Sequence, residues 1–280
     1  EESAARIVLK ILYAARMGRP DLYWAVNALA REITKWNVAC DKRLHRLICY
    51  IHHTKHFVQK CVVGDKIQDC SLALFVDASF AGDLTDSKST TGAMLYVIGP
   101  RTMVPITWIC KKQGAVSHSS SEAEVIALDA AVRMEGLPAL QLFDYLQEMF
   151  SDNPSSSTGL AEKTPGDFLS ETPTDFSFLD YVPCNVPYSK GSGFMYVLED
   201  NDAVIKMCIK GRSPTMRHVP RTHRVDLDWL LERVQKDPGI GLKYINTKLQ
   251  LADILTKGSF TGTIWNQLLE LMLLGPPSKK

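Results

Sequence analysis

The chain has 280 residues, of which 45% are hydrophobic and 22% charged, so it can bury an ordinary core in one or two globular domains. No apolar run approaches the roughly 18 to 20 residues that a membrane helix needs, so we expect no membrane partner. The sequence starts with Glu-Glu and lacks a basic-then-apolar leader, which predicts a piece of a longer polypeptide that is not secreted.

The seven cysteines are an odd number, contain no Cys-x-x-Cys pair and lie far apart in the sequence. This usage indicates reduced thiols in an intracellular setting. One group of cysteines and histidines has loosely finger-like spacing: Cys49, His52, His53, His56 and Cys61. Because the group falls inside a helical pattern, solvated and backbone-facing histidines are favoured over a structural zinc site.

Helical patterns fill the first 60 residues. The predicted helices run from Ala4 to Arg16, from Pro20 to Lys35 with proline in the first turn, and from Asp41 to about Lys55 with Asp41 as N-cap. The net charge of the chain is only +1, yet residues 1–60 hold eleven Lys and Arg against five Asp and Glu. Such a basic face suits contact with a duplex backbone, and an ordinary solvated helix face is the alternative.

Residues 71–149 are expected to form three strands and a helix. The runs Ser71–Ala78, Gly92–Ile98 and Val104–Cys110 follow one another at hairpin distances. The first run is apolar almost throughout, as expected for a central strand covered on both faces. Ser119 with Glu122 three residues later forms a capping box, so a helix begins there and continues past Arg133.

Residues 151–192 are rich in Ser, Thr, Pro and acids and show no apolar period, which predicts a flexible insertion. Residues 258–280 contain an amphipathic helix too short to span a bilayer, then a Pro-Pro-Ser-Lys-Lys end. Between these stretches we expect the strands Phe194–Leu198 and Ile240–Ile245, the helices Asn201–Lys210 and Val225–Lys236, and a further helix starting near Gln250.

Two acids lie within predicted apolar elements. Asp77 ends the first strand on an apolar face, where an unpaired buried carboxylate is costly, so we expect it to bind a partner. Glu124 shares a helical face with three apolar residues and should be buried against the sheet. Glu122 lies two residues away, points to another side of the helix and is explained by the capping box.

Four sequence blocks between residues 72 and 125 resemble a known family. They are Leu-Phe-Val-Asp-Ala-Ser-Phe-Ala-Gly-Asp around Asp77, Asp-Ser-Lys-Ser-Thr-Thr-Gly ending at Gly92, Trp-Ile-Cys-Lys-Lys-Gln from Trp108, and Ser-His-Ser-Ser-Ser-Glu-Ala-Glu ending at Glu124. Together they are similar to the ribonuclease H domain of Pol polyproteins from copia-type (Ty1/copia) LTR retrotransposons. Segments 12–29 and 44–51 resemble the end of the reverse transcriptase of the same polyproteins.

The resemblance covers about residues 5–149 and 193–275 and implies a fold. This fold is α/β, a ribonuclease H-like mixed five-stranded sheet with flanking helices, preceded by a small helical segment. The implied domains are the C-terminal helices of reverse transcriptase, the ribonuclease H-like domain, and a C-terminal helix with its tail: 1–65, 66–257 and 258–280. The insertion at about 151–192 is longer than the connection expected in the family.

The resemblance also implies which acids carry the chemistry. Asp77 matches the first of them, and Glu124 matches the second glutamate of the family's Glu-Ala-Glu. Asp200 stands where a strand meets a helix, at the family's Asp-Asn. Its neighbours have structural explanations, since Asp202 compensates the helix dipole and Glu199 belongs to the opposite face of the strand.

The fourth carboxylate has two candidates. Asp253 lies in the family's Ala-Asp-x-x-Thr-Lys signature and is preferred. Asp226 is the rival, in a segment where this chain has Arg224 in place of the family's histidine. Four such acids would hold two Mg²⁺ or Mn²⁺ ions, because hard cations prefer oxygen ligands.

The expected reaction is endonucleolytic hydrolysis of the RNA strand in an RNA/DNA hybrid. Recognition would use the 2′-hydroxyl groups and phosphates in the wide minor groove. The remainder of the polyprotein is an expected partner, and the expected location is a cytoplasmic virus-like particle, with the nucleus as an alternative. Candidate contacts are small polar and basic residues: Ser79, Lys88, Ser89, Thr90, Lys111, Lys112, Ser117, Ser119, Asn201, Arg221 and Arg224.

Two alternatives to this function remain open. One is a catalytically silent, transposon-derived fragment that only binds nucleic acid or a partner. The retained acids at positions 77, 124, 200 and 253 favour the enzyme, because neutral decay has no reason to spare all four. The other alternative is a nuclease of the same fold that acts on DNA.

Overall fold

The computed structural model describes residues 2–82, 86–150, 187–211, 216 and 218–277. Its first part is a group of three helices, α1 (Glu2–Met17), α2 (Tyr23–Arg31) and α3 (Val38–His53). Short 3-10 turns at Pro20–Leu22 and Ile33–Lys35 flank α2, so the single helix predicted over residues 20–35 is interrupted at both ends. These helices pack around their own small core.

The predicted N-cap of α3 is wrong. Asn37 caps the helix, because its side chain accepts the backbone N–H groups of Ala39 and Cys40 at 2.9 and 3.1 Å. Asp41 lies one turn inside the helix and instead accepts the indole N–H of Trp36 at 2.8 Å. Asn37, four residues before Asp41, therefore serves as the N-cap, and α3 begins earlier than predicted.

A five-stranded mixed sheet forms the centre of the molecule, as predicted. Its spatial order is β4-β3-β2-β5-β6; β2, β3 and β4 are antiparallel neighbours, whereas β5 and β6 run parallel to β2. Seven of the nine residues of β2 are buried, because helices cover both faces of the sheet. The strands are β2 (Ser71–Ser79), β3 (Thr90–Gly99), β4 (Thr102–Lys112), β5 (Met195–Glu199) and β6 (Ile240–Tyr244).

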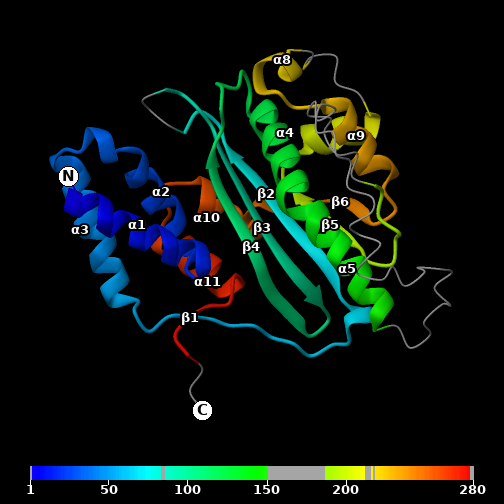
Figure 1. Ribbon diagram of the computed structural model, residues 1–280, viewed down its shortest axis with the longest axis horizontal. Helices are drawn as coiled ribbons and strands as arrows, with labels where there is room; N and C mark the ends of the chain where they lie inside the picture. Colours follow the sequence, from blue (N-terminus) through cyan, green and yellow to red (C-terminus); the bar gives the residue numbers. More distant parts are fainter. Residues whose placement is uncertain (1, 83–85, 151–186, 212–215, 217, 278–280) are drawn as a thin grey trace, which may run out of the picture.

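One face of the sheet is covered by a long helical layer (Figure 1). The layer begins at Ser119, as predicted, and a single π-helical turn at Val132–Gly136 joins its first two helices. A short helix before α9 was not predicted from the sequence. The layer contains α4 (Ser120–Ala131), α5 (Leu137–Met149), α7 (Asp202–Lys210), α8 (Val219–His223) and α9 (Leu227–Lys236).

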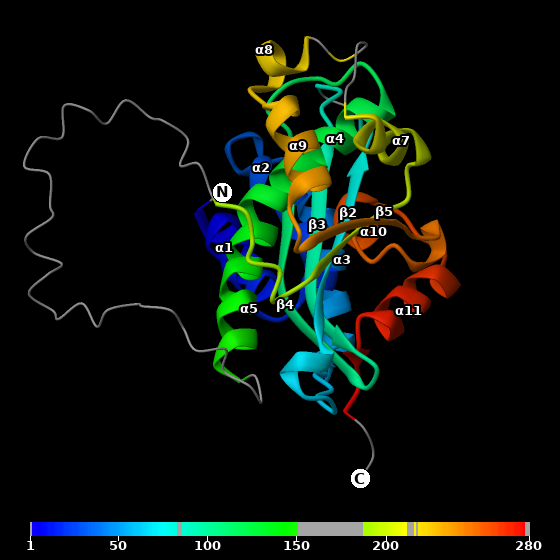
Figure 2. The same cartoon turned by 90° about the vertical axis from the view of Figure 1, so that its right-hand side faces the viewer.

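The opposite face is covered by α10 (Asp253–Thr256) and α11 (Gly262–Leu271) (Figure 2), and α2 packs beside α10 (Figure 1). Hydrogen bonds join the N-terminal helices to β4: Asn27 donates to the carbonyl of Cys110 at 2.7 Å, and the Trp108 indole donates to that of Ala15 at 2.9 Å. Among the described helices, none combines the length and apolar character needed to cross a membrane.

Two segments connect distant parts of the sequence. Strand β1 (Val58–Gln59) pairs antiparallel with β7 (Leu274–Gly275), which attaches the end of the chain to the segment after α3. Most of the predicted flexible insertion, residues 151–186, lies outside the described residues. Its last residues are held by two aspartates: Asp237 accepts the N–H of Ser189 at 3.1 Å, and Asp144 accepts that of Lys190 at 3.0 Å.

Candidate metal-binding active site

The sheet register brings two of the predicted acids, Asp77 and Asp200, together. Strands β2 and β5 are parallel and pair Phe75 with Leu198. Asp77 and Asp200 each lie two residues beyond this pair, so both carboxylates emerge at the same edge of the sheet. Asp77 is 3% exposed, whereas Asp200 is half-buried at the end of its strand.

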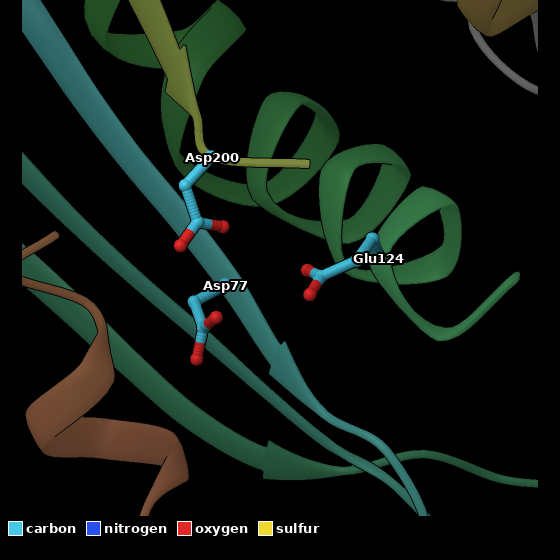
Figure 3. Close-up of side chains that lie close together, drawn as sticks. All are labelled: Asp77, Glu124 and Asp200. Atoms are coloured by element: carbon cyan, nitrogen blue, oxygen red, sulfur yellow. The ribbon is translucent and has the colours of Figure 1, made fainter. Parts of the chain in front are cut away.

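Helix α4 supplies a third carboxylate to the same place. Glu124 is 7% exposed and lies one turn into the helix, and the backbone N–H of Ala78 at the end of β2 donates to it. One ligand oxygen of each of Asp77, Glu124 and Asp200 lies within 4.8 Å of the other two. Figure 3 shows the three side chains pointing toward one another from β2, α4 and the segment after β5.

Asp253 reaches this cluster from the opposite face of the sheet. It begins α10, and its carboxyl group is in hydrogen-bonding contact with that of Asp77. The hydroxyl group of Thr256 on the same helix donates to Asp77, and the Lys257 ammonium lies 2.6 Å from Asp253 Oδ1. Strand β2, helix α10 and its flanking lysine therefore form one ionic network.

The close approach of α10 depends on Gly92. This residue pairs with Asp77 across β2 and β3. A Cβ atom at Gly92 would lie 2.5 Å from Thr256 Cγ2 and 3.0 Å from the carbonyl oxygen of Ala252. The side-chain amide of Gln250 adds a second link, donating to the carbonyl of Val76 at 2.8 Å.

Asp226, the rival for the fourth carboxylate, has a different place in the structure. It is exposed and caps α9, where its Oδ1 accepts the N–H of Trp229 at 3.0 Å. Asp202 is likewise in the first turn of α7, as expected for dipole compensation. Of the two candidates, Asp253 is the one in contact with Asp77.

Glu199 is the acid that sequence reasoning missed. Strand alternation assigned it to the opposite face from Asp200, yet the residue is fully buried and interacts electrostatically with Asp77 and Asp200. Its Oε1 accepts the N–H of Asn201 at 3.1 Å. The burial of β5 on both faces was the available signal, because a glutamate there needs a partner wherever it points.

Burial and mutual repulsion make these carboxyl groups weak acids. Desolvation and the charge of Asp77 raise the pKa of Glu124 to about 10 and that of Asp253 to about 7. Desolvation, with the charges of Asp200 and Asp77, raises the pKa of Glu199 to about 8. Desolvation also raises the pKa of Asp77, although Lys257 and Thr256 oppose the shift.

Lys257 partly compensates this negative charge. Burial alone would lower its pKa, but the carboxylates of Asp77, Asp253 and Asp200 outweigh burial and raise it. One ammonium cannot neutralise five neighbouring acids. Among the buried oxygens of these acids, Glu124 Oε2 and Glu199 Oε2 also lack a hydrogen-bond partner within the described residues. Such a set of hard oxygen donors fits a divalent cation of the Mg²⁺ or Mn²⁺ type.

The predicted capping box is confirmed in one half only. Ser119 Oγ accepts the N–H of Glu122 at 3.1 Å, as expected. The carboxylate of Glu122, however, turns to His118, His218 and His223, and is 1% exposed. Burial would raise its pKa, but the backbone N–H of His118 and the imidazoles of His218 and His223 outweigh burial and lower the pKa.

The candidate duplex contacts divide by exposure. Ser89, Thr90 and Ser117 are buried; Ser89 Oγ accepts the N–H of Ala81, and Ser117 Oγ donates to Gln113. Lys112 pairs with Asp86 at 2.8 Å. The remaining candidates are half-exposed or exposed: Ser79, Lys88, Lys111, Ser119, Asn201, Arg221 and Arg224. Two of these, Ser119 and Asn201, also cap helices.

Several proteins to which the chain is similar are encoded by transposons. It is 36% identical over 109 residues to the retrovirus-related Pol polyprotein from transposon RE1 of Arabidopsis thaliana, and 37% identical over 114 residues to that from transposon RE2. The chain is similar to transposon-encoded Pol polyproteins. It is also 28% identical over 127 residues to a transposon Ty5-1 protein of Saccharomyces cerevisiae.

These similarities are partial. Each Arabidopsis match covers 38% of this chain and 7% of the polyprotein, and the yeast match covers 45% of this chain and 39% of the relative. No family model matches the chain, and no solved structure matches it. The comparisons therefore support a retroelement origin and a place within a larger polyprotein.

Proposed function

We propose that this chain is a ribonuclease H that cleaves the RNA strand of RNA/DNA hybrids, encoded within a copia-type Pol polyprotein. The observation that carries the proposal is the convergence of Asp77, Glu124 and Asp200 from three different elements within 4.8 Å. The five-stranded mixed sheet with helices on both faces and the similarity to Pol polyproteins support it. A Pol polyprotein also gives a reason for an enzyme that acts on hybrids.

Asp77, Glu124, Asp200 and Asp253 would hold two Mg²⁺ ions, which supply an activated water and stabilise the leaving 3′ oxygen. The four carboxylates come from a strand, two helices and a strand end that all pack on the same sheet, so the donor oxygens are positioned before substrate arrives. Thr256 fixes the orientation of Asp77 by donating to it. Lys257 holds Asp253 in place and keeps part of the negative charge balanced.

Substrate recognition is proposed to use the exposed polar and basic residues at the same edge of the sheet. Arg221 and Arg224 would contact phosphates, and Lys88 and Lys111 extend the basic surface beyond the carboxylates. Ser79 and Asn201 are within the segments that carry Asp77 and Asp200, so they are suitably placed for 2′-hydroxyl contacts. The buried hydroxyl groups of Ser89, Thr90 and Ser117 would shape this edge rather than touch the duplex.

The test is a comparison of substrates. The purified chain is incubated with Mg²⁺ and an end-labelled 20-base-pair RNA/DNA hybrid, beside the same sequence as duplex RNA and as duplex DNA. The proposal expects cleavage of the RNA strand in the hybrid alone, leaving 5′-phosphate and 3′-hydroxyl ends. Cleavage of duplex DNA would favour a DNA nuclease, and binding of the hybrid without any cleavage would favour a silent fragment.

A further inference from the structure

The Glu122 carboxylate joins two elements that lie far apart in the sequence. Its Oε1 accepts a hydrogen bond from His223 Nε2 at 3.0 Å, and its Oε2 accepts one from His218 Nε2 at 3.1 Å. The backbone N–H of His118 donates to the same Oε2 at 3.0 Å, and the ring of His118 packs edge-on against that of His218. Both carboxylate oxygens are thus used to hold α8 against the start of α4.

Helix α8 needs such an external anchor. It has only five residues, from Val219 to His223, and a helix of this length is not stable by itself. Val219 is fully buried, whereas Arg221, Thr222 and Arg224 are exposed. The side chain of His223 is only 2% exposed although its neighbours on both sides face solvent, which marks it as an anchor rather than a surface contact.

We propose that Glu122 is a positioning residue which, through His218 and His223, fixes Arg221 and Arg224 for binding the phosphates of the duplex. The inference rests on the proposed function and deepens it by naming what sets the geometry of the phosphate contacts. Glu122 lies two residues before Glu124 on α4, so the same helix that supplies a carboxylate to the active site also supplies the anchor for α8. The distance between the phosphate contacts and the carboxylate cluster is thereby set by one rigid helix.

The experiment measures the affinity of the full chain for a fluorescent RNA/DNA hybrid by anisotropy over a range of salt concentrations. Ca²⁺ replaces Mg²⁺, because a divalent cation is needed to offset the acidic cluster. Glu122→Gln keeps the size of the side chain but cannot accept from both histidines as an ionised carboxylate does. It is expected to weaken binding about 10-fold near 0.1 M salt and to reduce the slope of log affinity against log salt by about 1 to 2, because each phosphate contact contributes roughly 0.9.

A change of salt slope separates this role from a purely structural one. Asp144→Asn is the matched control, because Asp144 is also a buried carboxylate that joins two elements, accepting the N–H groups of Gly193 and Lys190. It is expected to lower thermal stability and leave the salt slope unchanged. In an Arg221→Ala/Arg224→Ala background, Glu122→Gln is expected to have no further effect on affinity.

His218→Gln provides a milder variant, since the His218 side chain is 41% exposed and its replacement leaves the His223 contact in place. It is expected to give a smaller loss of affinity in the same direction. An unchanged salt slope in both variants, or full additivity of Glu122→Gln with the double arginine variant, would overturn the inference. Cleavage by the wild type with Mg²⁺ is measured separately. If the wild type does not cleave the hybrid but the binding effects are as expected, the proposed function is refuted and the inference about Glu122 stands.

Discussion

At the scale of single residues, the burial of the acids explains both why they would bind a cation and why they destabilise the metal-free fold. The folded protein holds Asp77 and Glu124 in places where their ionised forms are disfavoured, and burial is the largest cause. Without a cation, such groups destabilise the fold. An isosteric neutral residue should therefore improve metal-free stability while it removes activity, which is the signature of a site selected for function.

The first prediction concerns Asp77→Asn. Activity on the hybrid should fall at least ~10²-fold, the scale on which single transition-state contacts act in enzymes. In EDTA, however, the melting temperature should rise, because the amide removes the buried charge of Asp77 and its repulsion with Asp200 and Glu124. Calorimetry at pH 8 measures the second effect. A large drop in melting temperature would show that Asp77 is a structural acid.

The second prediction separates Asp253 from Asp226. Asp253→Asn should weaken Mg²⁺ binding and cleavage, because Asp253 contacts Asp77. Asp226→Asn should leave both unchanged and cost little stability, because asparagine is as good an N-cap as aspartate. Isothermal titration with Mg²⁺ and a cleavage assay decide the matter. The assignment is wrong if the Asp226 variant alone loses activity.

At the scale of elements, periodicity predicted the strands well and the short helices poorly. The apolar run at residues 71–78 predicted strand β2, and Ser119 predicted the start of α4. Helix α8 escaped because five residues around Pro220 carry no helical period. Helix α10 has only four residues, so the helix predicted from Gln250 begins three residues later, after a 3-10 turn.

The third prediction tests how closely α10 must approach the sheet. Gly92→Ala should push Thr256 and the Ala252 carbonyl away from β3 and displace Asp253 from Asp77. We expect a loss of roughly 1 to 3 kcal/mol in unfolding free energy from overpacking, together with weaker Mg²⁺ binding. Chemical denaturation and metal titration measure the two effects.

Gly262→Ala is the matched control for this substitution. Gly262 is in the first turn of α11, and a Cβ atom there would meet nothing within 4 Å. The variant should be neutral or stabilising by up to about 1 kcal/mol, because alanine is the better helix former. Equal behaviour of the two variants would mean that the close contact at Gly92 is unimportant.

At the scale of the whole molecule, the sequence indicated which acids lie near one another better than it indicated what surrounds them. Asp77, Glu124, Asp200 and Asp253 were chosen from motifs and helix geometry. The structure brings ligand oxygens of the first three within 4.8 Å of one another and places Asp253 where it interacts with Asp77. The burial of Glu199, the hydrogen bond from Thr256 to Asp77 and the histidine partners of Glu122 depend on long-range packing. Local periodicity carries no information on contacts between residues about one hundred positions apart.

The fourth prediction is a fall in metal-free stability as pH rises. Folded Asp253, Glu199 and Glu124 keep protons up to pKa values of about 7, 8 and 10, whereas the unfolded chain releases them near pH 4. The folded state therefore binds more protons, and stability decreases from about pH 4 through these values. In EDTA the melting temperature should be lower at pH 8.5 than at pH 5.5, as calorimetry can measure.

Mg²⁺ should reverse this loss, and more strongly at pH 8.5 than at pH 5.5, because it binds the ionised carboxylates and competes with protons. A melting temperature that is insensitive to pH in EDTA, or a Mg²⁺ effect equal at both pH values, would contradict the account. The Asp77→Asn variant should show a smaller response to Mg²⁺ at either pH.

The central claim is that the carboxylate cluster cleaves RNA paired with DNA, and one measurement tests it most directly. Wild type, Asp77→Asn and Glu124→Gln are incubated with a labelled RNA/DNA hybrid and Mg²⁺, and hybrid binding is recorded for each in Ca²⁺. We predict metal-dependent cleavage by the wild type, loss of cleavage in both variants, and binding retained in all three. Hybrid binding by the wild type with no metal-dependent cleavage, or cleavage that survives both substitutions, would contradict the claim.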